Sequence, residues 1–214
     1  VVSTASYEAR VFGVGSAMPT SKAKLLCPHG VFVAPRMKCY QEASTKIMRV
    51  FSEFSPLVEQ LSVDEAFLDL SGTEKLFGHP EQTAEQIKKR IFHETQLTCS
   101  IGIAANKFLA KLTSGLHKPN GTTNFLDGDI PKRLAHFPLK QLWGVGPKTL
   151  ERLNFLGFKI FEDIQNSDEQ TMQNHFGSHG PQLYNLSFGR DDRPVSPGEG
   201  RKSIGSESTF NQDI

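Results

Sequence analysis

The sequence predicts an α+β protein, with a mixed β-sheet and its helices followed by a region made only of helices. Between residues 58 and 126, short strand-like runs alternate with longer segments of helical periodicity. After residue 129 the strand-like runs stop, and the remaining segments up to residue 188 have the pattern of short helices. This change of pattern indicates a domain boundary near residues 126–129.

The first 54 residues contain short elements and one long helix. We expect a strand at residues 1–4, a helix of one or two turns at 5–12, a second helix from about residue 18 to 28–30, and a short strand at 31–33. Residues 40–54 are predicted to form an amphipathic helix, because Ala43, Ile47 and Val50 recur with the helical period. Pro56 ends this helix.

Residues 58–126 follow the order strand, strand, helix, strand, helix, strand. The expected bounds are 58–63, 66–70, 83–95, 98–104, 106–117 and 122–126, with a turn at 118–121. This order fits a mixed sheet with helices on one face, as in ferredoxin-like folds. The opening strand of that pattern would lie before Val1, so we expect the chain to be the interior of a longer protein.

The last third is expected to be helical at 130–137, 147–156, 160–166, 168–176 and 182–188. Residues 192–200 are polar and rich in Pro and Gly, which is typical of a linker. Residues 201–210 have a strand-like pattern that begins with two basic residues.

Composition excludes several classes of protein. The 214 residues are 37% hydrophobic and 22% charged, as in a soluble globular protein, and the net charge of +1 gives no bulk attraction to nucleic acid. The sequence has three widely spaced cysteines (Cys27, Cys39 and Cys99) and no CxxC pair, which argues against a disulfide framework or a zinc site. No run reaches transmembrane length and no signal peptide is present.

Two adjacent carboxylates, Asp64 and Glu65, stand between the first two strands of the predicted sheet. In a straight strand they would face opposite sides, so they could share a ligand only if the chain turns there. Mg²⁺ prefers oxygen ligands and keeps substrate phosphates in its shell, so a pair of this kind suits phosphate chemistry. The alternative is a solvated hairpin turn.

Three residues near the start could bind an anion. Thr4, Tyr7 and Arg10 are spaced by three, so on a helix they would share a face, and Arg recognises phosphate through two hydrogen bonds. The alternative is an ordinary polar face. Lys111, on the predicted helix 106–117, could contact DNA or only lie on a solvated face.

Residues 142–148 resemble the turn of a helix-hairpin-helix motif. Gly144 and Gly146 flank Val145, Pro147 starts a helix, and Lys148 adds charge. Glycines let backbone N–H groups approach a phosphate at a helix N-terminus, and such a contact carries no sequence information. A plain corner between helices is the alternative here, and it is our interpretation of residues 176–180.

The motifs occur in an order that resembles the Y-family translesion DNA polymerases of the DNA polymerase IV (DinB) type. They are Ser3-Thr4-Ala5-Ser6-Tyr7-Glu8-Ala9-Arg10, Ser16-Ala17-Met18-Pro19, Ser62-Val63-Asp64-Glu65-Ala66, Gly102-Ile103-Ala104, Lys107-Phe108-Leu109-Ala110-Lys111, Lys118-Pro119-Asn120-Gly121, Gly144-Val145-Gly146 and Arg201-Lys202-Ser203-Ile204-Gly205. By this resemblance, residues 1–36 are part of the fingers, 37–126 most of a ferredoxin-like palm without its first strand, and 127–193 an all-α thumb. A linker at 194–202 and the start of a little finger domain at 203–214 follow.

The resemblance also implies roles for individual residues. Asp64 and Glu65 would be catalytic and would hold two Mg²⁺ ions. The incoming dNTP triphosphate would be bound by Thr4, Tyr7, Arg10 and Lys118. The implied DNA-binding residues are Gly144, Val145, Gly146, Lys148, Arg201 and Lys202.

The implied activity is template-directed addition of dNTPs to a primer 3′-OH, opposite damaged or undamaged template. The resemblance implies a cytoplasmic monomer of DNA repair and replication that binds a sliding clamp through a C-terminal segment outside this sequence. The family's first strand, with a metal-binding Asp and an aromatic residue that excludes ribonucleotides, is also outside it. We therefore expect the chain alone to bind primer–template DNA weakly and not to extend it. A catalytically silent DNA-binding relative and a nucleotidyl cyclase-like palm are the alternatives.

Overall fold

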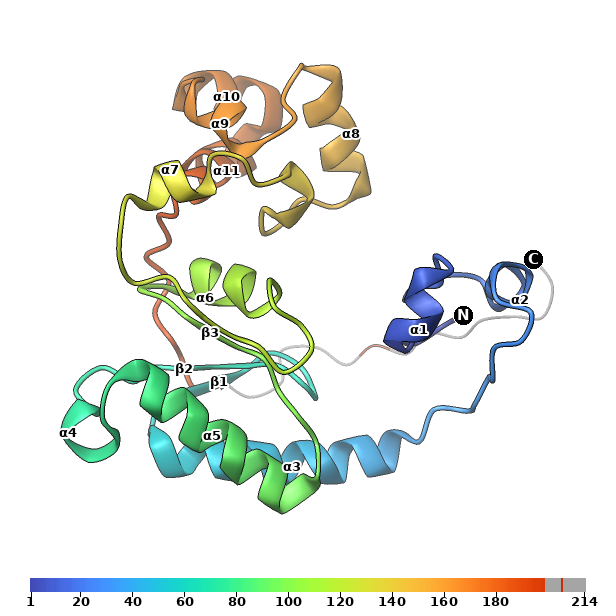
Figure 1. The fold of residues 1–214 in the computed structure, drawn as a ribbon. Helices are drawn as coiled ribbons and strands as arrows, with labels where there is room; N and C mark the ends of the chain where they lie inside the picture. Colours follow the sequence, from blue (N-terminus) through green and yellow to red (C-terminus); the bar gives the residue numbers. More distant parts are fainter. Residues whose placement is uncertain (199–204, 206–214) are drawn as a thin grey trace. The chain divides into compact units, whose positions relative to one another are not determined.

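A computed structural model describes residues 1–198 and Gly205, and it confirms the α+β fold class (Figure 1). The described chain divides into two compact units, Val1–Gln41 and Glu42–Gly198, and the division falls inside a helix. The expected strand at 201–210 lies outside the described residues, and so do Arg201 and Lys202.

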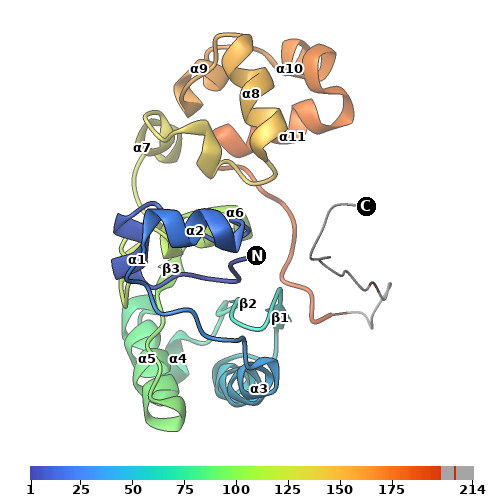
Figure 2. The ribbon, with the colours of Figure 1, turned by 90° about the vertical axis from the view of Figure 1, so that its right-hand side faces the viewer.

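The first unit has two short helices, α1 (Tyr7–Val11) and α2 (Thr20–Leu26), drawn in blue in Figure 2. A small core of Val14, Ala23 and Cys27 packs between them and the connecting loops. The expected strands at 1–4 and 31–33 are wrong. Val2 makes two backbone hydrogen bonds with residues 17 and 18, but no strand develops, and Val31 is 89% exposed.

Helix α3 (Met37–Phe54) begins three residues before its expected start, and the strands that follow form two small sheets. β1 (Val58–Gln60) and β2 (Ala66–Leu68) pair antiparallel, while β3 (Ile101–Ile103) and β4 (Thr122–Asn124) pair parallel. Both kinds of pairing that a mixed sheet requires are therefore present, in strands shorter than expected. Within the described residues, no backbone ladder joins the two sheets.

Helices cover both sides of β3, where the sequence predicted one covered face. Ile101 packs with Val50 of α3 and Ile91 of α5 (Pro80–Thr95), whereas the neighbouring residue, Gly102, lies against α6 (Lys107–Ser114). Successive residues of a strand point to opposite faces, so α3 and α5 lie on one side and α6 on the other (Figure 1). A short helix, α4 (Glu74–Phe77), was not expected.

The region after residue 129 is helical as predicted. It contains α7 (Ile130–Leu134), η1 (Leu139–Gln141), α8 (Pro147–Phe155), α9 (Phe161–Gln165), α10 (Glu169–Phe176), η2 (Gly177–His179) and α11 (Gly180–Ser187). Its core continues into α6, because Phe108 and Leu109 are buried in the same cluster as Phe161 and Leu183. The hydrophobic core is therefore continuous across residue 127, where the strands end and the all-helical region begins.

In the part of the chain that the structure describes, every helix is too short or too polar to cross a membrane.

Candidate functional site

The two adjacent carboxylates lie in a tight loop between β1 and β2. β1 ends at Gln60, three residues earlier than the sequence predicted, and β2 begins at Ala66 as expected. The carbonyl oxygen of Glu65 accepts hydrogen bonds from the N–H groups of Leu61 (2.9 Å) and Ser62 (3.3 Å), which closes the turn. The chain therefore turns where sharing a ligand requires it.

Each carboxylate has its own partner in the structure. The hydroxyl of Ser62 donates to Oδ1 of Asp64 (2.6 Å), so this serine orients the exposed carboxylate. Glu65 forms an ion pair with Lys111 of α6. Lys111 thus faces the carboxylate loop, and both interpretations that the sequence left open for it, a DNA contact and a solvated helix face, stay predictions.

The donor set of this loop fits a shared Mg²⁺ site. Asp64 and Glu65 offer hard carboxylate oxygens at the surface, and Mg²⁺ keeps water and phosphate oxygens in its shell. Among residues 1–198 and Gly205, no three His, Cys, Asp or Glu side chains are grouped to hold a metal ion. The nearby Asp69 accepts a hydrogen bond from the N–H of Ser71 (2.9 Å), and these contacts with Ser71 lower its pKa.

The expected anion-binding group in the first unit forms only in part. Ser6 caps α1 by accepting a hydrogen bond from the N–H of Ala9, so Thr4 precedes the helix and the shared-face argument fails for it. Tyr7 and Arg10 do share a face, with the guanidinium carbon 5.4 Å from the ring centroid. Arg10 also donates through Nε to the carbonyl of Ala5 (3.0 Å), which leaves its terminal nitrogens available for an anion.

Lys118, in the second unit, is exposed in the loop between α6 and β4. In the described part of the chain it has no hydrogen-bond or ion-pair partner. Its charge is therefore available to a ligand.

The turn before α8 requires glycine at one position and leaves the helix without a side-chain cap. Gly144 adopts φ +90°, and a Cβ there would meet Nε2 of His179 at 2.9 Å, so glycine is required. Gly146 is the N-cap of α8 and makes no side-chain cap, and Pro147 follows at the first helical position. No side chain therefore caps the backbone N–H groups of the first turn of α8, and Lys148 is exposed in that same turn. Residues 177–179 form η2, an interhelix turn, as we interpreted them.

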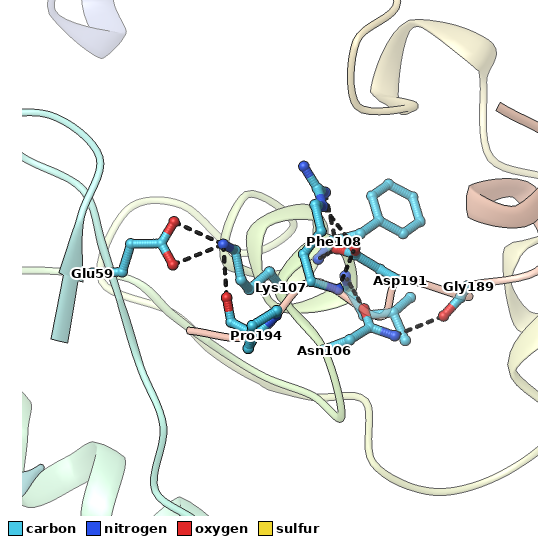
Figure 3. A network of polar contacts seen from close by, with 9 residues as sticks. Glu59, Asn106, Lys107, Phe108, Gly189, Asp191 and Pro194 are labelled. Carbon is cyan, nitrogen blue, oxygen red and sulfur yellow. Dashed lines mark hydrogen bonds and ion pairs between the residues drawn. The ribbon is translucent and has the colours of Figure 1, made fainter. Parts of the chain in front are cut away.

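A buried ion pair close to the carboxylate loop escaped the sequence analysis. Nζ of Lys107 lies 2.7 Å from both carboxylate oxygens of Glu59, and their side chains are only 10% and 17% exposed (Figure 3). Burial raises the pKa of Glu59, but the hydrogen bonds from Lys107 and Ser196 and the charges of Lys107 and Arg193 hold it below its ordinary value. The only sequence signal is the pair of lysines, 107 and 111, spaced by four on α6.

Two parts of the chain match known family models. Residues 1–115 match the impB/mucB/samB family, and residues 127–158 match the HHH motif of the IMS family. Among curated proteins, the chain is 42% identical to the DNA polymerase IV of Desulfatibacillum aliphaticivorans and 44% identical to that of Cronobacter sakazakii. Both matches cover the whole chain but only 54% and 61% of those two proteins, so the chain spans little more than half of their length.

Solved structures give the same fold. The chain superposes on the crystal structure of DinB from Sulfolobus solfataricus with a TM-score of 0.80 and 31% identity, over 91% of this chain and 57% of the other. An insertion ternary complex of Dbh DNA polymerase matches equally well, with a TM-score of 0.80 and 31% identity over the same shares of the two chains.

Proposed function

Because the chain belongs to the impB/mucB/samB family, we propose that it is the fingers, palm and thumb part of a translesion DNA polymerase of the DNA polymerase IV type. The observation that carries this proposal is the β1–β2 loop, where a tight turn brings two adjacent carboxylates to the surface beside α6. The names of the similar proteins support it.

In this proposal, Asp64 and Glu65 hold two Mg²⁺ ions. The bound metal would supply Lewis-acid stabilisation of the attacking and leaving oxygens in nucleotidyl transfer to a primer 3′-OH. Ser62 fixes the orientation of the Asp64 carboxylate through its 2.6 Å hydrogen bond, and Glu65, which pairs with Lys111 in the structure, would be the second carboxylate that holds the metal.

The cationic residues bind the triphosphate of the incoming dNTP. Arg10, with Tyr7 and Thr4 beside it in sequence, would clamp the phosphates, and Lys118 would contribute a second charge. Positive charge at these positions offsets the charge that builds up on the departing pyrophosphate.

The thumb would hold the primer–template duplex through the turn before α8. The N–H groups of its first helical turn, together with Gly144, Val145, Gly146 and Lys148, suit a phosphate contact that positions the backbone without reading bases. Arg201 and Lys202, outside the described residues, would add basic contacts.

We further propose a cytoplasmic monomer that binds a sliding clamp through a segment outside this sequence. The domain division at residues 36, 126, 193 and 202 belongs to the same proposal. It is compatible with the family match ending at residue 115 and the motif match starting at 127.

The test is Asp64→Ala in the full-length protein. Primer extension with Mg²⁺ should be abolished, because the metal loses its oxygen ligand, while the affinity for primer–template stays within about twofold. Ser52→Ala, a surface change on α3, is the matched control. Extension by Asp64→Ala within a few-fold of the parent would refute the site. Duplex binding by the full-length parent without any extension would favour a silent DNA-binding protein.

A further inference from the structure

The Glu59–Lys107 pair joins two segments that are 48 residues apart. Its side chains are nearly buried, and a charge buried without its partner is strongly destabilising, so each residue requires the other. The ammonium group of Lys107 also lies 5.5 Å from the ring centroid of Phe67, on the strand paired with that of Glu59. The pair therefore fixes the first turn of α6 against the β1–β2 hairpin.

Both members of the pair use their remaining hydrogen-bonding capacity on one later segment, residues 189–196, which we call the linker strap. Lys107 donates to the carbonyl oxygen of Pro194 (3.1 Å), and the N–H of Ser196 donates to Oε2 of Glu59 (2.8 Å). Figure 3 shows the Lys107 ammonium between the Glu59 carboxylate and the Pro194 carbonyl. This part of the Pro-rich linker is therefore tied to the sheet and not free.

The other end of the strap is held by the start of the same helix. Asn106 donates through Nδ2 to the carbonyl of Gly189 (2.7 Å), and the carboxylate of Asp191, 3% exposed, accepts from the N–H of Phe108 (3.0 Å). Arg193 bonds to Asp191 and places its guanidinium 4.3 Å from the ring centroid of Trp143. The N-cap of α6 and the first two residues of the helix thus bind the strap along its length.

The same helix contacts the carboxylate loop one turn further on. Lys107 and Lys111 are four residues apart, so they lie on one face of α6 and reach Glu59 and Glu65 of the same hairpin. No backbone ladder joins the two described sheets, so these two ion pairs are direct ties between α6 and the hairpin.

We propose that Glu59 and Lys107 are positioning residues that lock the linker strap to the hairpin carrying Asp64 and Glu65, so that the chain leaves the strap at Ser196 in a fixed relation to the carboxylates. The catalytic consequence rests on the proposed function. A polymerase must hold its duplex in register with its metal-binding carboxylates, and a misplacement of about 1 Å is costly in rate. The Glu59–Lys107 pair would keep the linker strap, and the duplex-binding part of the chain joined to it, in a fixed position relative to the two carboxylates.

The first experiment measures amide hydrogen exchange by NMR in the 214-residue chain. In Glu59→Leu combined with Lys107→Met, which removes the acceptor of the Ser196 N–H, the Ser196 amide should exchange at least tenfold faster than in the parent. Lys107→Met alone removes the tie to Pro194 and the cation that holds the Glu59 carboxylate in place, so it should have the same effect. The double variant leaves no unpaired charge, so it keeps the test valid if the single variant unfolds. The Phe108 amide should stay protected, because Asp191 still accepts its hydrogen bond.

Two further variants sharpen this measurement. Glu53→Gln, which breaks the exposed pair with Arg90, should leave the Ser196 amide unchanged. Lys107→Arg should restore most of the protection. Exchange at Ser196 within twofold of the parent in both charge-removing variants would overturn the lock.

The second experiment measures primer extension by the full-length protein. Releasing the strap should raise the apparent KM for primer–template about tenfold and leave the KM for dNTP unchanged, with rescue by Lys107→Arg. An unchanged KM for DNA would overturn the positioning role. If Asp64→Ala fails to abolish extension, the proposed function fails, and the exchange result at Ser196 still decides the lock.

Discussion

Gly102 is the position where a single methyl group should do most damage to the palm-like region. A Cβ at this residue would lie 2.1 Å from the carbonyl oxygen of Ala110, 2.4 Å from Oγ1 of Thr113 and 2.6 Å from the backbone nitrogen of Ser114. Ordinary Cβ contacts begin at 3.4 Å. Two of the three atoms belong to the backbone, so no rotamer change relieves the overlap and α6 must move by about 1 Å away from β3.

We expect Gly102→Ala to cost about 3 kcal/mol, the upper end of the range for overpacking a core. Each kcal/mol lowers Tm by about 2–4 °C in a chain of this size, so the expected fall is roughly 6–12 °C. Thermal unfolding followed by circular dichroism measures it. Gly198→Ala is the control, since a Cβ there meets nothing within 4 Å, and its Tm should move by about 1 °C at most. Equal values of Tm for the two variants would refute the close packing of α6 on β3.

Three other changes test the charged groups. Arg10→Ala and Lys118→Ala should each raise the apparent KM for dNTP about tenfold in steady-state extension assays, which corresponds to about 1.4 kcal/mol of lost binding free energy. Unchanged dNTP kinetics in both variants would mean that these residues do not bind the triphosphate. Lys148→Glu should weaken duplex binding for any sequence and reduce the slope of log affinity against log salt by about 1, and an unaltered slope would exclude a phosphate contact. The pKa of Glu59 lies below its ordinary value of 4.5, so its ion pair stabilises the fold above that pH and is lost as the pH falls through the lowered pKa. Melting curves of the parent and Glu59→Gln should therefore differ at pH 7 and converge once the pH falls below the lowered pKa of Glu59. A difference that stays constant with pH would count against the buried pair.

Apart from the short helix α4, the order of α-helices and strands after residue 40 and the hairpin before α8 were predictable from the sequence, and the turn at Asp64–Glu65 was one of the conformations that it left open. Each depends on neighbours in the chain: the helical period of α3, two carboxylates between two strand-like runs, and glycines ahead of a proline. The strand-like residues 31–33 failed as a prediction, because a strand needs a hydrogen-bonded partner and a local pattern cannot specify one.

Local capping also overturned the argument that Thr4 shares a helical face with Tyr7 and Arg10. The sequence spacing of Thr4, Tyr7 and Arg10 would place all three on one helical face, but Ser6 takes the N-cap position and starts the helix after Thr4. The contact between Tyr7 and Arg10 survives because both residues lie within α1.

The sequence by itself determined which residues carry charge and which segments form helices, but only the tertiary structure determined how those charges are paired. Lys107 and Lys111 look alike on a basic helix face, yet one is nearly buried against Glu59 and the other meets Glu65 at the surface. Ser196 reaches Glu59 across 137 residues. Such pairings depend on how α6, the hairpin and the linker strap pack, because a buried charge is tolerated only where packing brings an opposite charge and hydrogen-bond donors to it.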